Sequence, residues 1–129
     1  MANTPPQVEK PVSRDELAAV VVRFYEVARE DPLIGPVFME RVGNWDAHLE
    51  KMTRFWASAL LREGSYQGNP IQKHRSMGLT HDQFVSWLEL FEQTAIEVLG
   101  QGRSAELVGL AQRMGQSIEM RSGVRSKYP

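Results

Sequence analysis

The chain has 129 residues, of which 42% are hydrophobic and 24% charged, and its formal net charge is −1; these values fit a single soluble globular domain. A charge this close to zero gives no strong electrostatic field, so neither nucleic acid nor an anionic membrane is expected as the main partner. Because the chain contains no cysteine, disulfides, thiolate catalysis, thiolate-ligated iron, cysteine-type zinc sites and iron–sulfur clusters are all excluded.

The amino-terminal segment 1–12 carries three prolines and is expected to form an extended, mobile arm. It lacks the apolar stretch that a secretory signal needs, and no apolar run in the chain approaches the length of a membrane span. A cytoplasmic location is therefore the expectation. The folded domain is predicted to occupy residues 13–120, and the basic tail, residues 121–129, is predicted to be frayed.

The first helix is predicted over residues 14–30. Ser13 and Glu16 form a capping-box pattern at its start, and its apolar residues recur at helical spacing. The dipeptide Asp31-Pro32 ends this helix, because a residue before proline disfavours the helical conformation. The following Gly35-Pro36 predicts that the next stretch is irregular.

The strongest amphipathic pattern in the sequence spans residues 45–62. Asn44 is a suitable N-cap for it. Residues His48 and Met52 lie one turn apart on its apolar face, so this helix places an imidazole among side chains that are expected to be buried.

A second histidine lies on the apolar face of a short helix predicted to begin at Pro70, a residue type that suits the first helical position. Ile71, His74 and Met77 recur at i, i+3 and i+6, so the imidazole shares a face with two apolar side chains. Gly78 is expected to break this helix.

Two further helices complete the pattern. Thr80 and Gln83 form a second capping box, and the helix that follows carries Trp87 inward and ends at Gly100. Ser104 is predicted to start the last helix. Since no segment shows convincing two-residue alternation, the fold class is all-α, with about five helices.

The three histidines are the main candidates for chemistry. His81, beside Asp82 in the first turn of a helix, is expected to be exposed. His48 and His74 each need a hydrogen-bond partner or a metal on their apolar faces, and a bond to a carbonyl at the edge of the core is the ordinary interpretation. Zinc requires three or four ligands, whereas haem requires one axial histidine; this inventory therefore favours haem.

A haem slot also needs large flexible and aromatic side chains along its walls. Each candidate taken singly is more often ordinary core, so the argument depends on the set. Lys73 and Arg75 flank His74 on its polar side and are candidates to pair with the haem propionates. The candidate wall residues are Phe38, Met52, Phe55, Trp56, Met77, Phe91 and Met114.

Three blocks of the sequence, within residues 14–100, resemble the group III truncated (2-on-2) haemoglobins. These blocks are FYEVAREDPLIGPVF, NWDAHLEKMTRFWASALL and PIQKHRSMGLTHDQFVSWLELF, and they resemble the family's helix B–CD, helix E and helix F–G regions. The resemblance implies a 2-on-2 helical sandwich, helices B and E over G and H, with haem b (iron protoporphyrin IX) between the layers. It implies His74 as the proximal iron ligand and a distal pocket with Tyr25, His48 and Trp87, with Met52 one turn beyond His48 and Phe38 near the CD corner.

The polar distal pocket indicates what such a haem would do. Bound O₂ carries partial negative charge, so a tyrosine hydroxyl and a tryptophan N–H would strengthen its binding. His48 has three open roles: donor to the ligand, gate, or ligand of the iron. The expected function is reversible binding of O₂, CO, NO or other small ligands, in a pocket too polar for bulk oxygen transport.

Two alternatives stand beside this interpretation. The same haem could oxidise NO to nitrate or reduce peroxide, and either activity would need electrons from a separate reductase. In the other alternative the chain is a cofactor-free helical interaction module, with its aromatic residues as plain core. No catalytic residue and no oligomeric state follow from the sequence.

Overall fold

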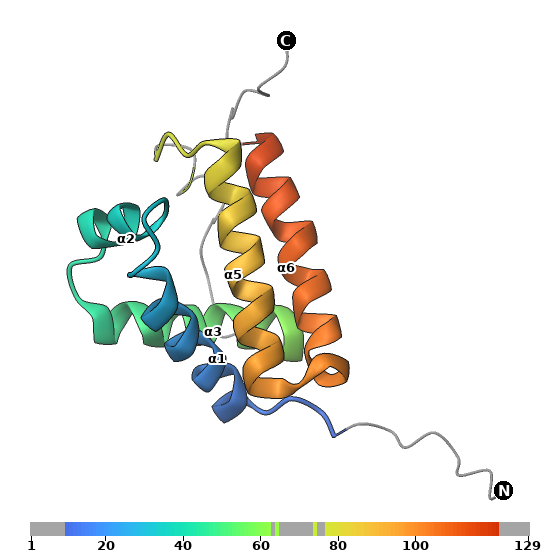
Figure 1. The fold of residues 1–129 in the computed structure, drawn as a ribbon. Coiled ribbons are helices and arrows are strands. Elements are labelled where there is room, and N and C mark those ends of the chain that lie inside the picture. Colours follow the sequence, from blue (N-terminus) through green and yellow to red (C-terminus); the bar gives the residue numbers. More distant parts are fainter. Residues whose placement is uncertain (1–9, 63, 65–73, 75–76, 122–129) are drawn as a thin grey trace, which may run out of the picture.

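The computed structural model describes residues 10–62, 64, 74 and 77–121. These residues form five α-helices and contain no strand, which confirms the predicted all-α fold. None of the described helices is long and apolar enough to cross a lipid bilayer. The helices are α1 (Arg14–Ala28), α2 (Gly35–Arg41), α3 (Trp45–Leu61), α5 (His81–Leu99) and α6 (Gln101–Arg121) (Figure 1).

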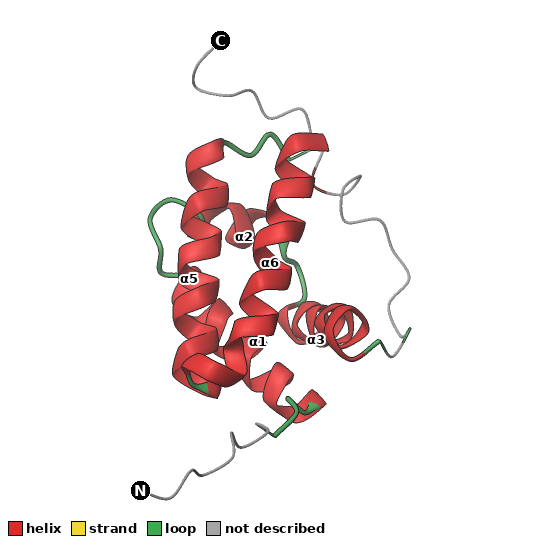
Figure 2. Ribbon diagram, turned by 90° about the vertical axis from the view of Figure 1, so that its right-hand side faces the viewer, coloured by secondary structure: helices red, strands yellow, loops and turns green. Residues whose placement is uncertain are grey.

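The helices form two layers. Helices α5 and α6 lie side by side, α1 packs against both α5 and α3, and α3 also contacts α6. Figure 2 shows α3 nearly end-on beside α6, so this helix runs across the α5/α6 pair instead of along it. The pair α1/α3 over the pair α5/α6 is the predicted 2-on-2 sandwich.

Local side-chain caps fix the starts of three helices. The predicted capping boxes are both present, with Ser13 at α1 and Thr80 at α5, and the Asn44 side chain accepts the N–H of Ala47 at the start of α3. Such caps satisfy backbone N–H groups that have no partner within the helix. Helix α5 ends at Gly100, as predicted, where the backbone takes the left-handed φ of 86° that suits glycine.

The prediction of an irregular stretch after the first helix is wrong, because residues 35–41 form α2. The Asp31 carboxylate accepts the N–H groups of Leu33 and Ile34 at 2.9 Å each and so shapes the turn that enters the helix. Pro36 lies in the first turn of α2, where its missing N–H would have had no partner within the helix. The proline that indicated irregular structure therefore starts a helix.

The predicted start of the last helix is also wrong, by one turn. Helix α6 begins at Gln101, and Ser104 already donates its N–H to the Gly100 carbonyl at 3.0 Å. The Ser104 side chain is 1% exposed and donates to the carbonyl of Gln101, so it is a buried residue of the helix and not a cap. One glycine is enough to end α5 and begin α6, and no loop separates the two helices.

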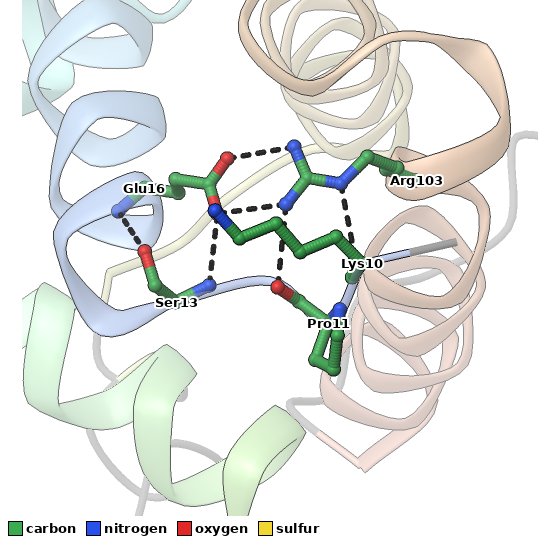
Figure 3. A network of polar contacts seen from close by, with 5 residues as sticks. All are labelled: Lys10, Pro11, Ser13, Glu16 and Arg103. Atoms are coloured by element: carbon green, nitrogen blue, oxygen red, sulfur yellow. Dashed lines mark hydrogen bonds and ion pairs between the residues drawn. The ribbon is translucent and has the colours of Figure 1, made fainter. Parts of the chain in front are cut away.

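The last residues of the predicted amino-terminal arm are attached to the domain (Figure 3). Arg103 on α6 donates to the carbonyl oxygens of Lys10, at 3.1 Å, and Pro11, at 3.3 Å, and binds both carboxylate oxygens of Glu16 at 2.7 Å. Val12 packs against the core. Residues 1–9 and the tail from residue 122 lie outside the described residues, so the predicted limits of the domain stay a prediction.

Candidate functional site

The candidate site is built around a contact between α1 and α3. Tyr25, in the last turns of α1, is 6% exposed, and its hydroxyl lies 2.9 Å from Nε2 of His48, in the first turn of α3. His48 is half-buried. Of the predicted distal residues, the structure therefore brings these two into direct hydrogen-bonding contact.

Burial keeps both side chains of this pair neutral near pH 7. It raises the pKa of the Tyr25 hydroxyl well above its ordinary value. It also lowers the pKa of the His48 imidazole, to which the positive charge of Lys51 contributes. Two neutral arrangements satisfy the contact. Either the Tyr25 hydroxyl donates to Nε2, or Nε2–H donates to the tyrosine oxygen and leaves the hydroxyl proton to point toward another acceptor.

Two residues that the sequence did not single out stand behind this pair. The Trp45 ring packs edge-to-face on Tyr25, with centroids 5.5 Å apart, and on His48, at 5.9 Å, while Tyr25 and His48 are 5.0 Å apart. The guanidinium carbon of Arg29 lies 4.5 Å above the centre of the Trp45 ring. The helical spacing of Trp45 to His48 was the available signal for Trp45; no sequence pattern pairs it with Arg29.

Helix α3 has two apolar faces. Thr53, Trp56 and Ala57 form its buried face, which packs into the core. His48, Met52 and Phe55 recur at i, i+4 and i+7 on another face and remain only half-buried. The apolar surface of this helix is thus wider than the part that the protein core covers.

The predicted site aromatics divide between this open face and the core. Trp56 and Phe91 are 5% and 2% exposed and stack with centroids 4.8 Å apart, so they are core residues in the structure. Trp87, half-buried on α5, stacks on Phe91 at 5.2 Å. The Phe24 ring touches both Trp87, at 5.8 Å, and Tyr25, at 5.0 Å. Trp87 therefore lies one aromatic ring away from the Tyr25–His48 pair.

Other predicted wall residues are half-buried. Phe38, on α2, packs edge-to-face on Tyr25 at 5.1 Å and so joins the aromatic cluster around the pair. Phe55 packs edge-to-face on Trp56 at 5.0 Å. Met77 and Met114 are half-buried as well.

The predicted iron ligand lies in the segment between α3 and α5. His74 is helical and half-buried, and its carbonyl accepts the N–H of Met77 at 3.1 Å. Gly78 takes a left-handed φ of 66°, as the predicted helix break requires. The propionate candidates Lys73 and Arg75 lie outside the described residues, as does most of the short helix that was predicted there.

His81 differs from the other two histidines in its surroundings. It is exposed at the start of α5, as predicted, and its Nδ1 contacts the carboxylate of Glu119 on α6. This contact attaches the amino end of α5 to the carboxyl-terminal part of α6, and it explains His81 without a cofactor.

The residues present fit a haem. The half-buried apolar face of α3 is the kind of surface that a flat apolar group would cover. Tyr25 and His48 supply polar groups beside that face, and His74, on a different segment, supplies an imidazole of the type that ligates haem iron.

Two known proteins show what the chain is similar to. Over 88 residues, which are 64% of this chain and 69% of the relative, the chain is 35% identical to the group 3 truncated hemoglobin ctb of Campylobacter jejuni. The crystal structure of group III truncated hemoglobin from Campylobacter jejuni matches the fold with a TM-score of 0.83 and 29% sequence identity, covering 95% of this chain and 98% of that chain. No family model matches the chain.

Proposed function

The chain belongs to the group 3 truncated haemoglobins, a family of globin haem proteins, and on this basis we propose that it binds haem b through His74 and holds O₂ or another diatomic ligand reversibly beside Tyr25 and His48. The observation that carries the proposal is the neutral Tyr25–His48 pair next to the half-buried apolar face of α3. A core made only for stability would gain free energy by burying that face completely.

Each residue of the site has a proposed role. The haem, when bound, supplies an iron that takes diatomic ligands, and the His74 imidazole holds that iron. Met52 and Phe55, on the open face of α3, would contact the porphyrin. The Tyr25 hydroxyl is the proposed donor to the ligand, and the Trp87 N–H is the proposed second donor.

The polarity of the pocket favours holding a ligand over delivering it. A hydrogen bond from a protein donor to an acceptor that carries charge contributes about 1.5–3 kcal/mol, and such a bond slows the release of O₂ while it lasts. We therefore propose retention, for storage, sensing or chemistry on the ligand, in place of bulk transport. The burial of Tyr25 supports this role, because a buried donor is not screened by water.

The test is a visible absorption spectrum of the purified chain, as isolated and after addition of hemin. We expect a Soret band in the ferric, ferrous and CO-bound forms. The His74→Ala variant should lose the spectrum of imidazole-ligated iron. The matched control His81→Ala should keep it, because His81 is occupied by Glu119 on the surface. A chain that folds and stays colourless with hemin would overturn the proposal and leave the helical interaction module as the better interpretation.

A control for folding accompanies these spectra. Far-ultraviolet circular dichroism of both variants should show the helix content of the wild type. A His74→Ala variant that is fully helical but still shows imidazole-ligated iron would transfer the ligand role to another histidine, and His48 would be the first candidate because it lies on the half-buried apolar face of α3.

A further inference from the structure

A second interhelical contact lies one helical turn outside the Tyr25–His48 pair. Arg29 follows Tyr25 by four residues and caps the carboxyl end of α1, while Trp45 precedes His48 by three residues and begins α3. Residues spaced by three or four lie on the same face of a helix. The contact between Arg29 and Trp45 and the contact between Tyr25 and His48 therefore join the same faces of the same two helices.

Both residues of the outer contact, Arg29 and Trp45, also touch the Tyr25–His48 pair. Arg29 donates from Nε to the Tyr25 carbonyl at 3.3 Å, which directs its guanidinium across the end of α1. The Trp45 ring, below that guanidinium, packs on both Tyr25 and His48. The His48 imidazole is half-buried, and the Trp45 ring is in contact with it and with its partner Tyr25.

We propose that Trp45, held by the Arg29 guanidinium, is a positioning residue that keeps the His48 imidazole against the Tyr25 hydroxyl and thereby sets how often this side of the pocket opens to small ligands. This inference rests on the proposed function for its consequence, the entry of ligand, but not for the contact itself. Arg29 is exposed, and a cation over an indole at an exposed site shifts an equilibrium by about two- to fivefold. We call this contact between Arg29 and Trp45 the latch. An effect of this size allows the pocket to open and close, because a much stronger contact would keep the pocket permanently closed.

The first measurement can already be made without haem. In ¹H–¹⁵N long-range spectra, the shifts of the two His48 ring nitrogens report its tautomer and its hydrogen bond. They are recorded for the full chain without cofactor and again for the CO complex. The wild type should show one fixed tautomer. Arg29→Gln, which removes the cation, should move both nitrogen shifts toward those of a solvent-exposed neutral imidazole, and Arg29→Lys, which keeps a cation, should restore them in part.

The second measurement is the rate of CO association after flash photolysis. If ligands enter through the open form, the rate rises with the fraction of open molecules, so Arg29→Gln should be about two- to fivefold faster than the wild type. The matched control is Arg23→Gln, which removes the same side chain from the same helix but from an ion pair with Glu97 at 3.1 Å. The control should change neither the CO rate nor the His48 shifts.

A further variant separates the two contacts that Arg29 makes. Trp45→Phe leaves the bond from Arg29 to the Tyr25 carbonyl in place but weakens the cation–aromatic contact, since Trp gives the strongest such interaction. It should move the shifts and the rate in the same direction as Arg29→Gln, and it decides the question if Arg29→Gln does not fold.

The outcomes distinguish the two proposals. If the His48 nitrogen shifts and the CO association rates of Arg29→Gln and Trp45→Phe equalled those of the control Arg23→Gln, the latch would be overturned. The proposed haem function would be untouched. A wild type that takes up no haem would overturn the proposed function, and the spectra of the cofactor-free chain would still decide whether Trp45 holds His48.

Discussion

The sharpest prediction for the proposed function concerns the hydroxyl of Tyr25. Tyr25→Phe removes one oxygen and leaves a ring that is held by four aromatic contacts in its buried place. A donor to an acceptor that carries charge contributes about 1.5–3 kcal/mol, and an ordinary neutral hydrogen bond contributes about 0.5–1.5 kcal/mol. Because the hydroxyl already pairs with His48 at 2.9 Å, a ligand that accepts from Tyr25 gains only the difference, about 1–1.5 kcal/mol.

That difference sets the expected rate change. O₂ should leave the ferrous Tyr25→Phe variant about five- to tenfold faster than the wild type, since 1.4 kcal/mol corresponds to a factor of ten. The assay is stopped-flow displacement of O₂ by excess CO. CO is the internal control, because it carries much less negative charge than O₂ and gains little from a donor. Its own dissociation rate should change less than about twofold.

Three results would refute this reasoning. An equal acceleration for O₂ and CO would mean that the variant changes access to the pocket and not the hydrogen bond to the ligand. An O₂ rate within twofold of the wild type, together with a large increase in Trp87→Phe, would move the donor role from Tyr25 to the indole. A third result, slower O₂ release in Tyr25→Phe, would show that the hydroxyl serves His48 and never reaches the ligand.

The remaining predictions concern the scaffold. A Cβ on Gly35 would lie 2.6 Å from the Arg29 carbonyl oxygen, whereas one on Gly43 would meet nothing within 4 Å. Gly35→Ala should therefore lower the free energy of unfolding by about 1–3 kcal/mol, which is a fall of ~4–12 °C in Tm measured by circular dichroism. If Gly35→Ala and the control Gly43→Ala had the same Tm, this prediction would be wrong. Hydrogen bonds from Arg103 and from the backbone N–H of Ser13 lower the pKa of Glu16 from 4.5 to about 2, so the ionised carboxylate stabilises the fold above pH 4.5 and loses this effect as the pH falls through 2. The difference in Tm between wild type and Glu16→Gln should accordingly be largest near pH 7 and vanish at about pH 2; a difference independent of pH would exclude the ion pair as its cause.

The helices that were predicted correctly at their starts are those with a local cap. Ser13, Asn44 and Thr80 each bond to a backbone N–H three residues away, so the whole signal lies within four residues of sequence. Helices α2 and α6 have no such cap. Helix α2 follows the turn that the Asp31 carboxylate holds, and Gly35 fits closely against the end of α1. Helix α6 begins directly after the turn at Gly100, which the sequence predicted only as the end of α5.

The aromatic residues show what periodicity leaves undetermined. Trp56 and Phe55 are adjacent on α3 and both belong to its broad apolar pattern, yet Trp56 is in the core and Phe55 is half-buried. Periodicity gives the direction of a side chain around its own helix. Which of two neighbouring directions meets another helix depends on how the helices cross, and that geometry comes from packing.

The same geometry explains why Tyr25 and His48 could be selected but not their latch. His48 stands on an apolar stripe, Tyr25 stands on the flank of one, and both match the family resemblance. Arg29, by contrast, ends α1 as an exposed cation, and Trp45 is one more apolar residue in the pattern of α3. Once one contact between two crossing helices is known, however, the residues one turn away on the same two faces are the candidates for a second contact. Arg29 and Trp45 are such candidates beside Tyr25 and His48, and the structure places their charged and aromatic groups 4.5 Å apart. Arg29→Gln and Trp45→Phe therefore examine a contact that follows from the crossing of α1 and α3, even though neither residue carries a motif.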